Sequence, residues 1–128
     1  QSISEETLVQ MGKGLFHFFL HDEYESKFRK MLTLEQFADK ELAELFSKQY
    51  FNEPMLYQSG VLQMMILQGK MKAEDANVMA LQFYAPIYLL LTVCDREPAR
   101  EQEALEMLEK HIRQLPLLFS FVQCLFRR

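Results

Sequence analysis

Two pairs of side chains, each four residues apart, are the chain's first candidates for chemistry. His17 and His21 would share one face of a helix, so both imidazole rings could reach one metal ion, with Asp22 or Glu25 as a further ligand. A structural metal site normally has four ligands, and no cysteine is near in the sequence. We therefore expect no metal here and interpret the pair as histidines at a partly exposed helix end.

The second pair is Tyr84 and Tyr88, which also fall on one helix face. A buried phenol needs a hydrogen-bonding partner and could orient a ligand that is otherwise held by apolar contacts. Eight methionines and eleven phenylalanines suit a pocket for varied apolar ligands. Plain core packing gives the same pattern, so spacing alone does not separate the two interpretations.

No arrangement of residues typical of an enzyme is visible in the sequence. The four glycines form no phosphate-binding loop. His111 would face Met107 and Ala104 on a helix, which is typical of a core or interface histidine rather than a catalyst. No serine lies in a nucleophile-elbow pattern; the serines are Ser2, Ser4, Ser26, Ser47, Ser59 and Ser120. We expect neither catalysis nor a cofactor.

Composition predicts one nearly all-helical domain over residues 1–128. Strong helix formers dominate, and the chain has only four glycines and four prolines. The net charge of −4 and the absence of a basic stripe argue against nucleic-acid binding by this chain alone. Cys94 and Cys124 are too few for a disulfide framework, which favours the cytoplasm. A start at Gln1 rather than Met suggests a fragment or a processed product.

Hydrophobic periodicity and capping residues predict six helices that position these side chains. The fourth helix is expected to begin at Pro54 and to end at Gly69, whose backbone should adopt a left-handed conformation. Pro116 should end or kink the sixth helix. The apolar tail 117–126 should cover a core or an interface, and in the alternative it forms a seventh helix.

Ser2, with Glu5 three residues later, is expected to cap the first helix, and either Thr33 or Asp39 the third. The expected ranges are 2–21, 24–32, 33–50 or 39–50, 54–69, 72–94 and 98–115.

The fifth helix carries the most information about assembly. Residues 76–94 contain no charge and are long enough for a membrane span, but Gln82 and Pro86 interrupt the run, so a buried helix is favoured. Both sides of this helix are apolar. We expect one side to pack in the core and the other, with the sixth helix, against a second copy, which gives a two-fold dimer.

Several segments together resemble the C-terminal regulatory domain of TetR-type transcriptional repressors, up to about Leu115. The segments are 31–35, 67–71 with Glu74 and Asp75 just beyond, 83–86, and 105–112. The resemblance implies an orthogonal or antiparallel bundle and a homodimer formed by the last two helices. It also implies a ligand that changes the spacing of two operator-binding helix-turn-helix domains. No such DNA-binding domain precedes Ser2 in this sequence.

The resemblance also suggests where a ligand and a second subunit would bind. Expected ligand contacts are Met31, Met64, Phe83, Tyr84 and Tyr88. The expected dimer contacts, on the apolar arc of the last helix, are Ala104, Met107, Leu108, His111 and Leu115. The alternative function is a helical interaction module without a small-molecule pocket. An enclosed apolar cavity would favour the sensor, and a solid core with an exposed groove would favour the interaction module.

Overall fold

The computed structural model describes residues 4–69 and 75–115, which are helical except for short turns and contain no strand. The all-α expectation is confirmed. The α-helices are α1 (Glu5–His21), α2 (Glu23–Glu35), α3 (Lys40–Ser47), α4 (Glu53–Leu67), α5 (Ala76–Arg96) and α6 (Glu101–Arg113). A π-helical turn, η1 (Lys48–Asn52), lies between α3 and α4, and a 3-10 turn, η2 (Pro98–Arg100), precedes α6. The predicted tail helix lies outside the described residues.

Short polar side chains set where several helices begin. Ser4, rather than Ser2, caps α1 by accepting a hydrogen bond from the backbone of Thr7 at 3.2 Å. Asp22, Asp39 and Asp75 cap α2, α3 and α5 in the same way. After α4, Gly69 adopts a φ of 72°, which confirms the expected left-handed exit.

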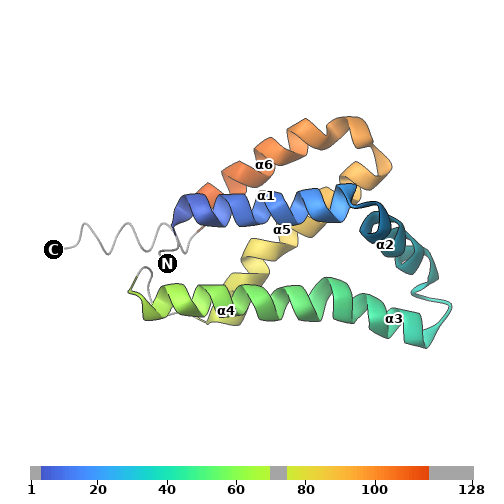
Figure 1. Ribbon diagram of the computed structural model, residues 1–128, viewed down its shortest axis with the longest axis horizontal. Helices are drawn as coiled ribbons and strands as arrows, with labels where there is room; N and C mark the ends of the chain where they lie inside the picture. The colour runs from blue at the N-terminus through green and yellow to red at the C-terminus, as the bar shows by residue number, and fades with distance from the viewer. Residues whose placement is uncertain (1–3, 70–74, 116–128) are drawn as a thin grey trace.

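Pro54 does not begin a separate helix, contrary to the sequence-based expectation. The chain is helical without interruption from α3 through η1 into α4 (Figure 1). In η1 the backbone N–H of Glu53 bonds to the carbonyl of Lys48, five residues back, which widens the turn just before the proline. Because α3, η1 and α4 form one rod, the described residues make five separate helices rather than six.

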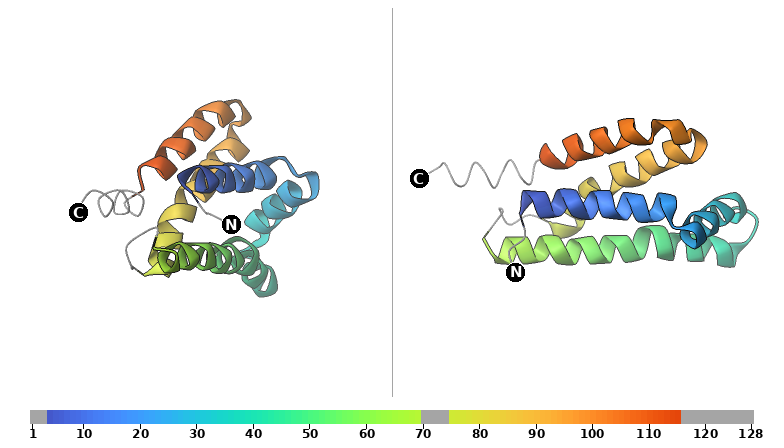
Figure 2. Two further views of the ribbon diagram at one scale, coloured as in Figure 1. Left: turned by 60° about the vertical axis from the view of Figure 1, so that its left-hand side comes forward. Right: turned by 45° about the horizontal axis from the view of Figure 1, so that its top comes forward.

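Helix α5 lies at the centre of the molecule, between the rod that ends in α4 and the pair formed by α1 and α6 (Figures 1 and 2). It is the one helix in the described ranges that is long and apolar enough to cross a membrane by length and composition. Its buried side chains join the hydrophobic core with those of the other helices. The buried residues of α5 are Met79, Ala80, Phe83, Tyr84, Ile87, Leu91 and Cys94.

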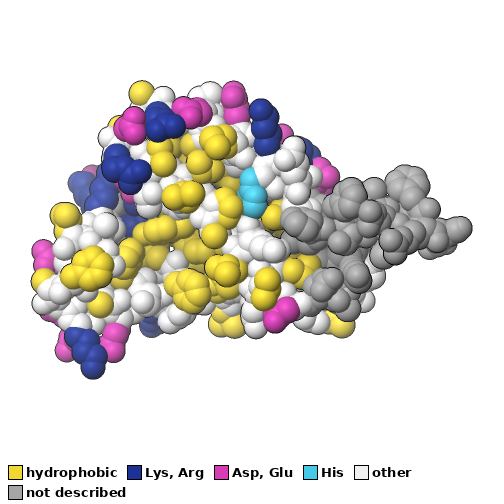
Figure 3. All heavy atoms as spheres, turned by 180° about the vertical axis from the view of Figure 1, so that it is seen from behind, with side chains coloured by type: hydrophobic (Ala, Val, Ile, Leu, Met, Phe, Trp, Pro, Cys, Tyr) yellow, Lys and Arg dark blue, Asp and Glu magenta, His cyan; other side chains and the backbone are white. Residues whose placement is uncertain are grey.

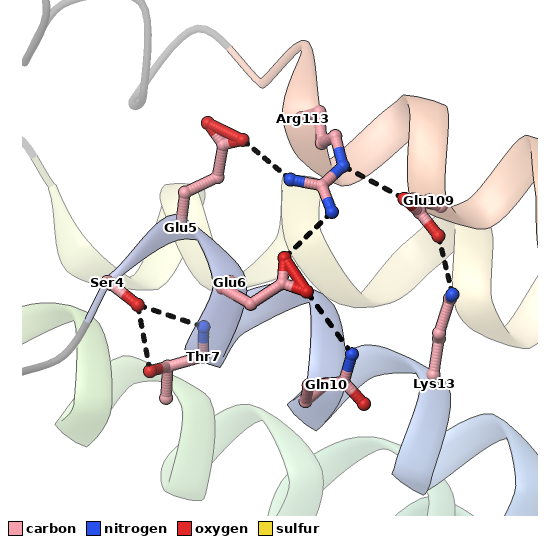
Figure 4. A network of polar contacts seen from close by, with 8 residues as sticks. All are labelled: Ser4, Glu5, Glu6, Thr7, Gln10, Lys13, Glu109 and Arg113. Atoms are coloured by element: carbon pink, nitrogen blue, oxygen red, sulfur yellow. Dashed lines mark hydrogen bonds and ion pairs between the residues drawn. The ribbon is translucent and has the colours of Figure 1, made fainter.

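Polar contacts align α1 antiparallel to α6 (Figure 4). The Arg113 guanidinium near the end of α6 lies 2.9 Å from Glu5 and 2.8 Å from Glu6 at the start of α1. Glu109 accepts from the same arginine at 3.0 Å and from Lys13 of α1 at 2.5 Å. Because these groups are exposed to solvent, they orient the two helices more than they stabilise the fold.

Candidate ligand groove and dimer face

A groove separates α5 from the rod of α3 and η1, beside the turn that follows α2. It holds about 500 Å³, is open to solvent, and is lined mostly by aromatic and aliphatic side chains. A second hollow of about 510 Å³ continues it past Tyr88 toward Asp95. The residues that line the groove are Gln36, Phe46, Ser47, Tyr50, Phe51, Leu81, Tyr84, Ala85, Tyr88, Leu89 and Thr92.

The floor of the groove depends on a bond between a tyrosine and the backbone of η1. Pro54 has no N–H, so it cannot bond to the carbonyl four residues earlier, which belongs to Tyr50. The hydroxyl of Tyr84 donates to that carbonyl at 2.6 Å, and both tyrosines are buried. Tyr84 therefore satisfies a backbone group that the proline leaves without a partner, and this joins α5 to η1.

The phenol of Tyr50 is also committed to an internal bond. It donates to the carboxylate of Glu25 on α2 at 2.5 Å, and its ring packs edge-on against Phe19 and Phe46, each with centroids 5.5 Å away. Burial, together with the bond to Glu25, raises the pKa of Tyr50 far above its ordinary value. Burial likewise raises the pKa of Tyr84, so both phenols stay neutral.

A buried ion pair lies beside this aromatic cluster. Arg29 of α2 is 1% exposed, and its Nη2 donates to Asp95 near the end of α5 and to the carbonyl of Phe19 in α1, both at 3.0 Å. Its Nη1 donates to the other carboxylate oxygen of Asp95. One guanidinium thus joins three helices, and the bidentate geometry fixes α2 relative to α5.

Tyr88 is the phenol best placed to meet a ligand. Its side chain is half-buried, and its ring lies 6.5 Å from that of Phe46 and 6.3 Å from those of Tyr50 and Tyr84 between centroids. It lines both hollows, so it marks their junction. Burial raises the pKa of Tyr88 as well, which keeps a neutral hydroxyl at this position.

The structure brings together only two of the five expected ligand contacts. Tyr84 and Tyr88 line the groove, whereas Met31 and Met64 are exposed outside it. Phe83 is buried in the core and faces α1, where its Cζ lies 3.6 Å from the position that a Cβ on Gly12 would take. On α5, Phe83 falls on the side that packs against α1, whereas Tyr84 falls on the side that lines the groove.

Sequence reasoning missed the residues that the second wall of the groove supplies. Phe46, Tyr50 and Phe51 come from α3 and η1, which were expected to precede a helix break. A signal for Tyr50 was present, since a residue four positions before a helical proline has a carbonyl in need of a new partner.

A second surface feature is the apolar face that α5 and α6 share, on the side shown in Figure 3. We call it the α5/α6 face: Leu81, Ala85, Leu89, Met107, His111 and Gln114. Hydrophobic side chains gather there in a broad band (Figure 3), and a shallow hollow between the two helices adds Pro86 at its edge. Leu89 and Met107 are more than half exposed.

The expected dimer contacts divide between this face and the core. Met107 is exposed and His111 is half-buried, so both can meet a second subunit. Ala104 and Leu108 are buried within the protomer, because that side of α6 packs against α1 and α5. Leu115, two residues past the end of α6, is buried too and lines the hollow between α5 and α6. Burial lowers the pKa of His111, while hydrogen bonding to the backbone of Phe83 and Gln82 opposes that shift.

Replacing Tyr84 with phenylalanine is expected to lower the free energy of unfolding by about 1–3 kcal/mol, because it leaves the buried Tyr50 carbonyl without a partner. Tyr88→Phe is the matched control and should lose less than about 1 kcal/mol, since Tyr88 is only half-buried. Urea unfolding followed by circular dichroism measures both. Equal losses of unfolding free energy in the two variants would show that the bond from Tyr84 to η1 does not contribute to stability.

No protein-family model, curated protein or solved structure matches the chain. The family resemblance therefore stays a prediction from the sequence segments given above, and the function is argued from the groove and the α5/α6 face.

Proposed function

We propose that this chain is the ligand-sensing and dimerisation domain of a TetR-type transcriptional regulator that acts in the cytoplasm without catalysis. The observation that carries the proposal is the position of α5, which supplies one wall of the aromatic groove and also half of the α5/α6 face. Leu81 and Ala85 line both the groove and the hollow between α5 and α6. Operator DNA would be bound only through an attached domain.

The shared helix suggests how ligand binding would be transmitted. A ligand that occupies the groove contacts Leu81, Ala85 and Tyr88, so a shift of α5 to accommodate it also displaces the surface that a second subunit contacts. The ligand acts as a switch only if it prefers one arrangement of α5 and α6 over another, and its largest effect is set by that preference.

The chemistry of the groove indicates an elongated or aromatic, mainly apolar ligand. Phe46 and Phe51 offer flat ring surfaces on one wall, and Tyr88 with the aliphatic side chains of α5 lines the other. The phenols of Tyr50 and Tyr84 are engaged internally, so Tyr88 is the group that we assign to a polar contact with the ligand.

Anilinonaphthalene sulfonate, an aromatic probe that fluoresces in apolar sites, tests the groove. We expect saturable binding to the native chain and at least about tenfold weaker binding to Ser47→Trp, in which an indole fills the groove. Gln63→Trp, at an exposed position on α4, is the matched control and should bind as the native chain does. Equal binding by both tryptophan variants would exclude the groove as the site.

The open groove favours the alternative function, a helical interaction module without a small-molecule ligand, since an enclosed cavity is what we expected of a sensor. The hollows of the described residues are open to solvent, as a docking groove for a partner would be. An absence of saturable probe binding by the native chain would make this alternative the better proposal, with the α5/α6 face unaffected.

A further inference from the structure

We propose that His17, His21 and Glu101 bind a divalent transition-metal ion, with Zn²⁺ as the ion that best suits the ligand set. The two histidines come from the last turns of α1, and the glutamate is the first residue of α6, eighty positions after His21. The possible ligand atoms of the three side chains all lie within 4.8 Å of one another.

The geometry of the cluster supports a shared ligand. His17 and His21 lie one helical turn apart with ring centroids 4.7 Å from each other, and Nε2 of His21 is 2.7 Å from Oε2 of Glu101. An ion bound at typical distances of about 2.0–2.2 Å to imidazole nitrogen and carboxylate oxygen fits between atoms this close after small rotations of the side chains.

The carboxylates near the histidines in sequence are not available as ligands. Asp22 caps α2 by accepting from the backbone of Glu25 at 2.9 Å, and the side chain of Glu25 accepts from Tyr50. Glu101 takes their place from another helix. Two histidines alone are weak evidence for a metal, but a third ligand brought in by the fold converts them into a two-histidine, one-carboxylate set.

The end of α1 favours a cation, and the exposure of the site leaves room for its remaining ligands. His21 lies in the last turn of α1, where the helix dipole places partial negative charge. The side chains of His21 and Glu101 are 44% and 32% exposed, so water can complete a four-coordinate ion. Zn²⁺ accepts such a mixture of nitrogen and oxygen ligands, and Co²⁺ can replace it as a coloured probe.

A metal at this position would join the end of α1 to the start of α6. The opposite ends of these antiparallel helices are already connected through Arg113 and its carboxylate partners. The ion would therefore complete the alignment of α1 with α6. Because it binds the folded chain, it would also raise the melting temperature.

The proposal is tested by titrating the tag-free chain with Co²⁺ and following the visible absorption, then displacing Co²⁺ with Zn²⁺. We expect one ion per chain and a rise in melting temperature with Zn²⁺. His21→Gln and Glu101→Gln should each weaken binding at least about tenfold. Neither side chain belongs to the hydrophobic core, so we expect both variants to keep the native fold, which circular dichroism verifies.

A control variant makes the test specific. Glu106→Gln removes an exposed carboxylate from the same helix as Glu101. It should bind Co²⁺ as the native chain does. Unchanged binding in His21→Gln and Glu101→Gln, no binding by the native chain, or one ion shared by two chains would each overturn the proposal.

Discussion

Replacing Asp95 with asparagine is expected to lower the free energy of unfolding by about 3 kcal/mol. The change keeps the shape of the side chain but removes the charge that balances Arg29, which is 1% exposed. Breaking a buried ion pair by removing one partner costs about 3–5 kcal/mol, because the other charge stays buried without compensation. Asp95 is 17% exposed, so the lower end of that range applies. Urea unfolding measures the loss.

Two comparison variants separate the buried charge from ordinary effects of mutation. Glu23→Gln removes one partner of the exposed pair with Lys27 and should change stability by less than about 0.5 kcal/mol. The double variant Arg29→Met with Asp95→Leu should lose less than Asp95→Asn does, since it removes both charges. If Asp95→Asn behaves like Glu23→Gln, then the ion pair does not hold α2 to α5.

Replacing Met107 with glutamate is expected to convert a symmetric dimer into a monomer. Met107 is 52% exposed and belongs to the α5/α6 face, where we propose that a second subunit packs. An interface that buries a carboxylate without a partner loses about 3 kcal/mol or more, which is roughly a hundredfold in the dissociation constant. In a two-fold dimer the charge is introduced twice. Sedimentation velocity over a concentration series measures the change.

Leu56→Glu is the matched control for the dimer. Leu56 is an exposed apolar residue of α4, away from the α5/α6 face, so its replacement should leave the association unchanged. Both variants should unfold at nearly the native urea concentration at low protein concentration, because neither side chain belongs to the core. A native chain that stays monomeric at all concentrations would remove the dimer from the proposed function.

Local sequence features predicted most of the helical structure. Apolar periodicity indicated where the helices run, Asp39 was one of the two expected caps of the third helix, and Gly69 was correctly expected to end one. These features depend on residues within one or two turns of each other, so the chain itself carries the information. Periodicity failed at Pro54, because a π-helical turn and a distant tyrosine together keep the helix continuous.

The same limit applies to the candidate sites. The sequence indicated Tyr84 and Tyr88 through their spacing, but it could not show that Tyr84 is bonded to the backbone of η1 and that Tyr88 is left for a ligand. In the sequence Arg29 stands next to Lys30 with no local sign of burial, whereas in the fold it is buried against Asp95. A buried charge is recognisable only once its partner is known.

The sequence by itself therefore determined where the helices lie and that two histidines share a helix face. Tertiary structure decided which groups Arg29 and His21 contact. Asp95 lies 66 residues from Arg29, and Glu101 lies 80 residues from His21. No local pattern encodes such a pairing, because it depends on how α1, α2, α5 and α6 pack. Packing is decided by the burial of apolar side chains over the whole domain, and the polar contacts form where that packing brings their donors and acceptors together.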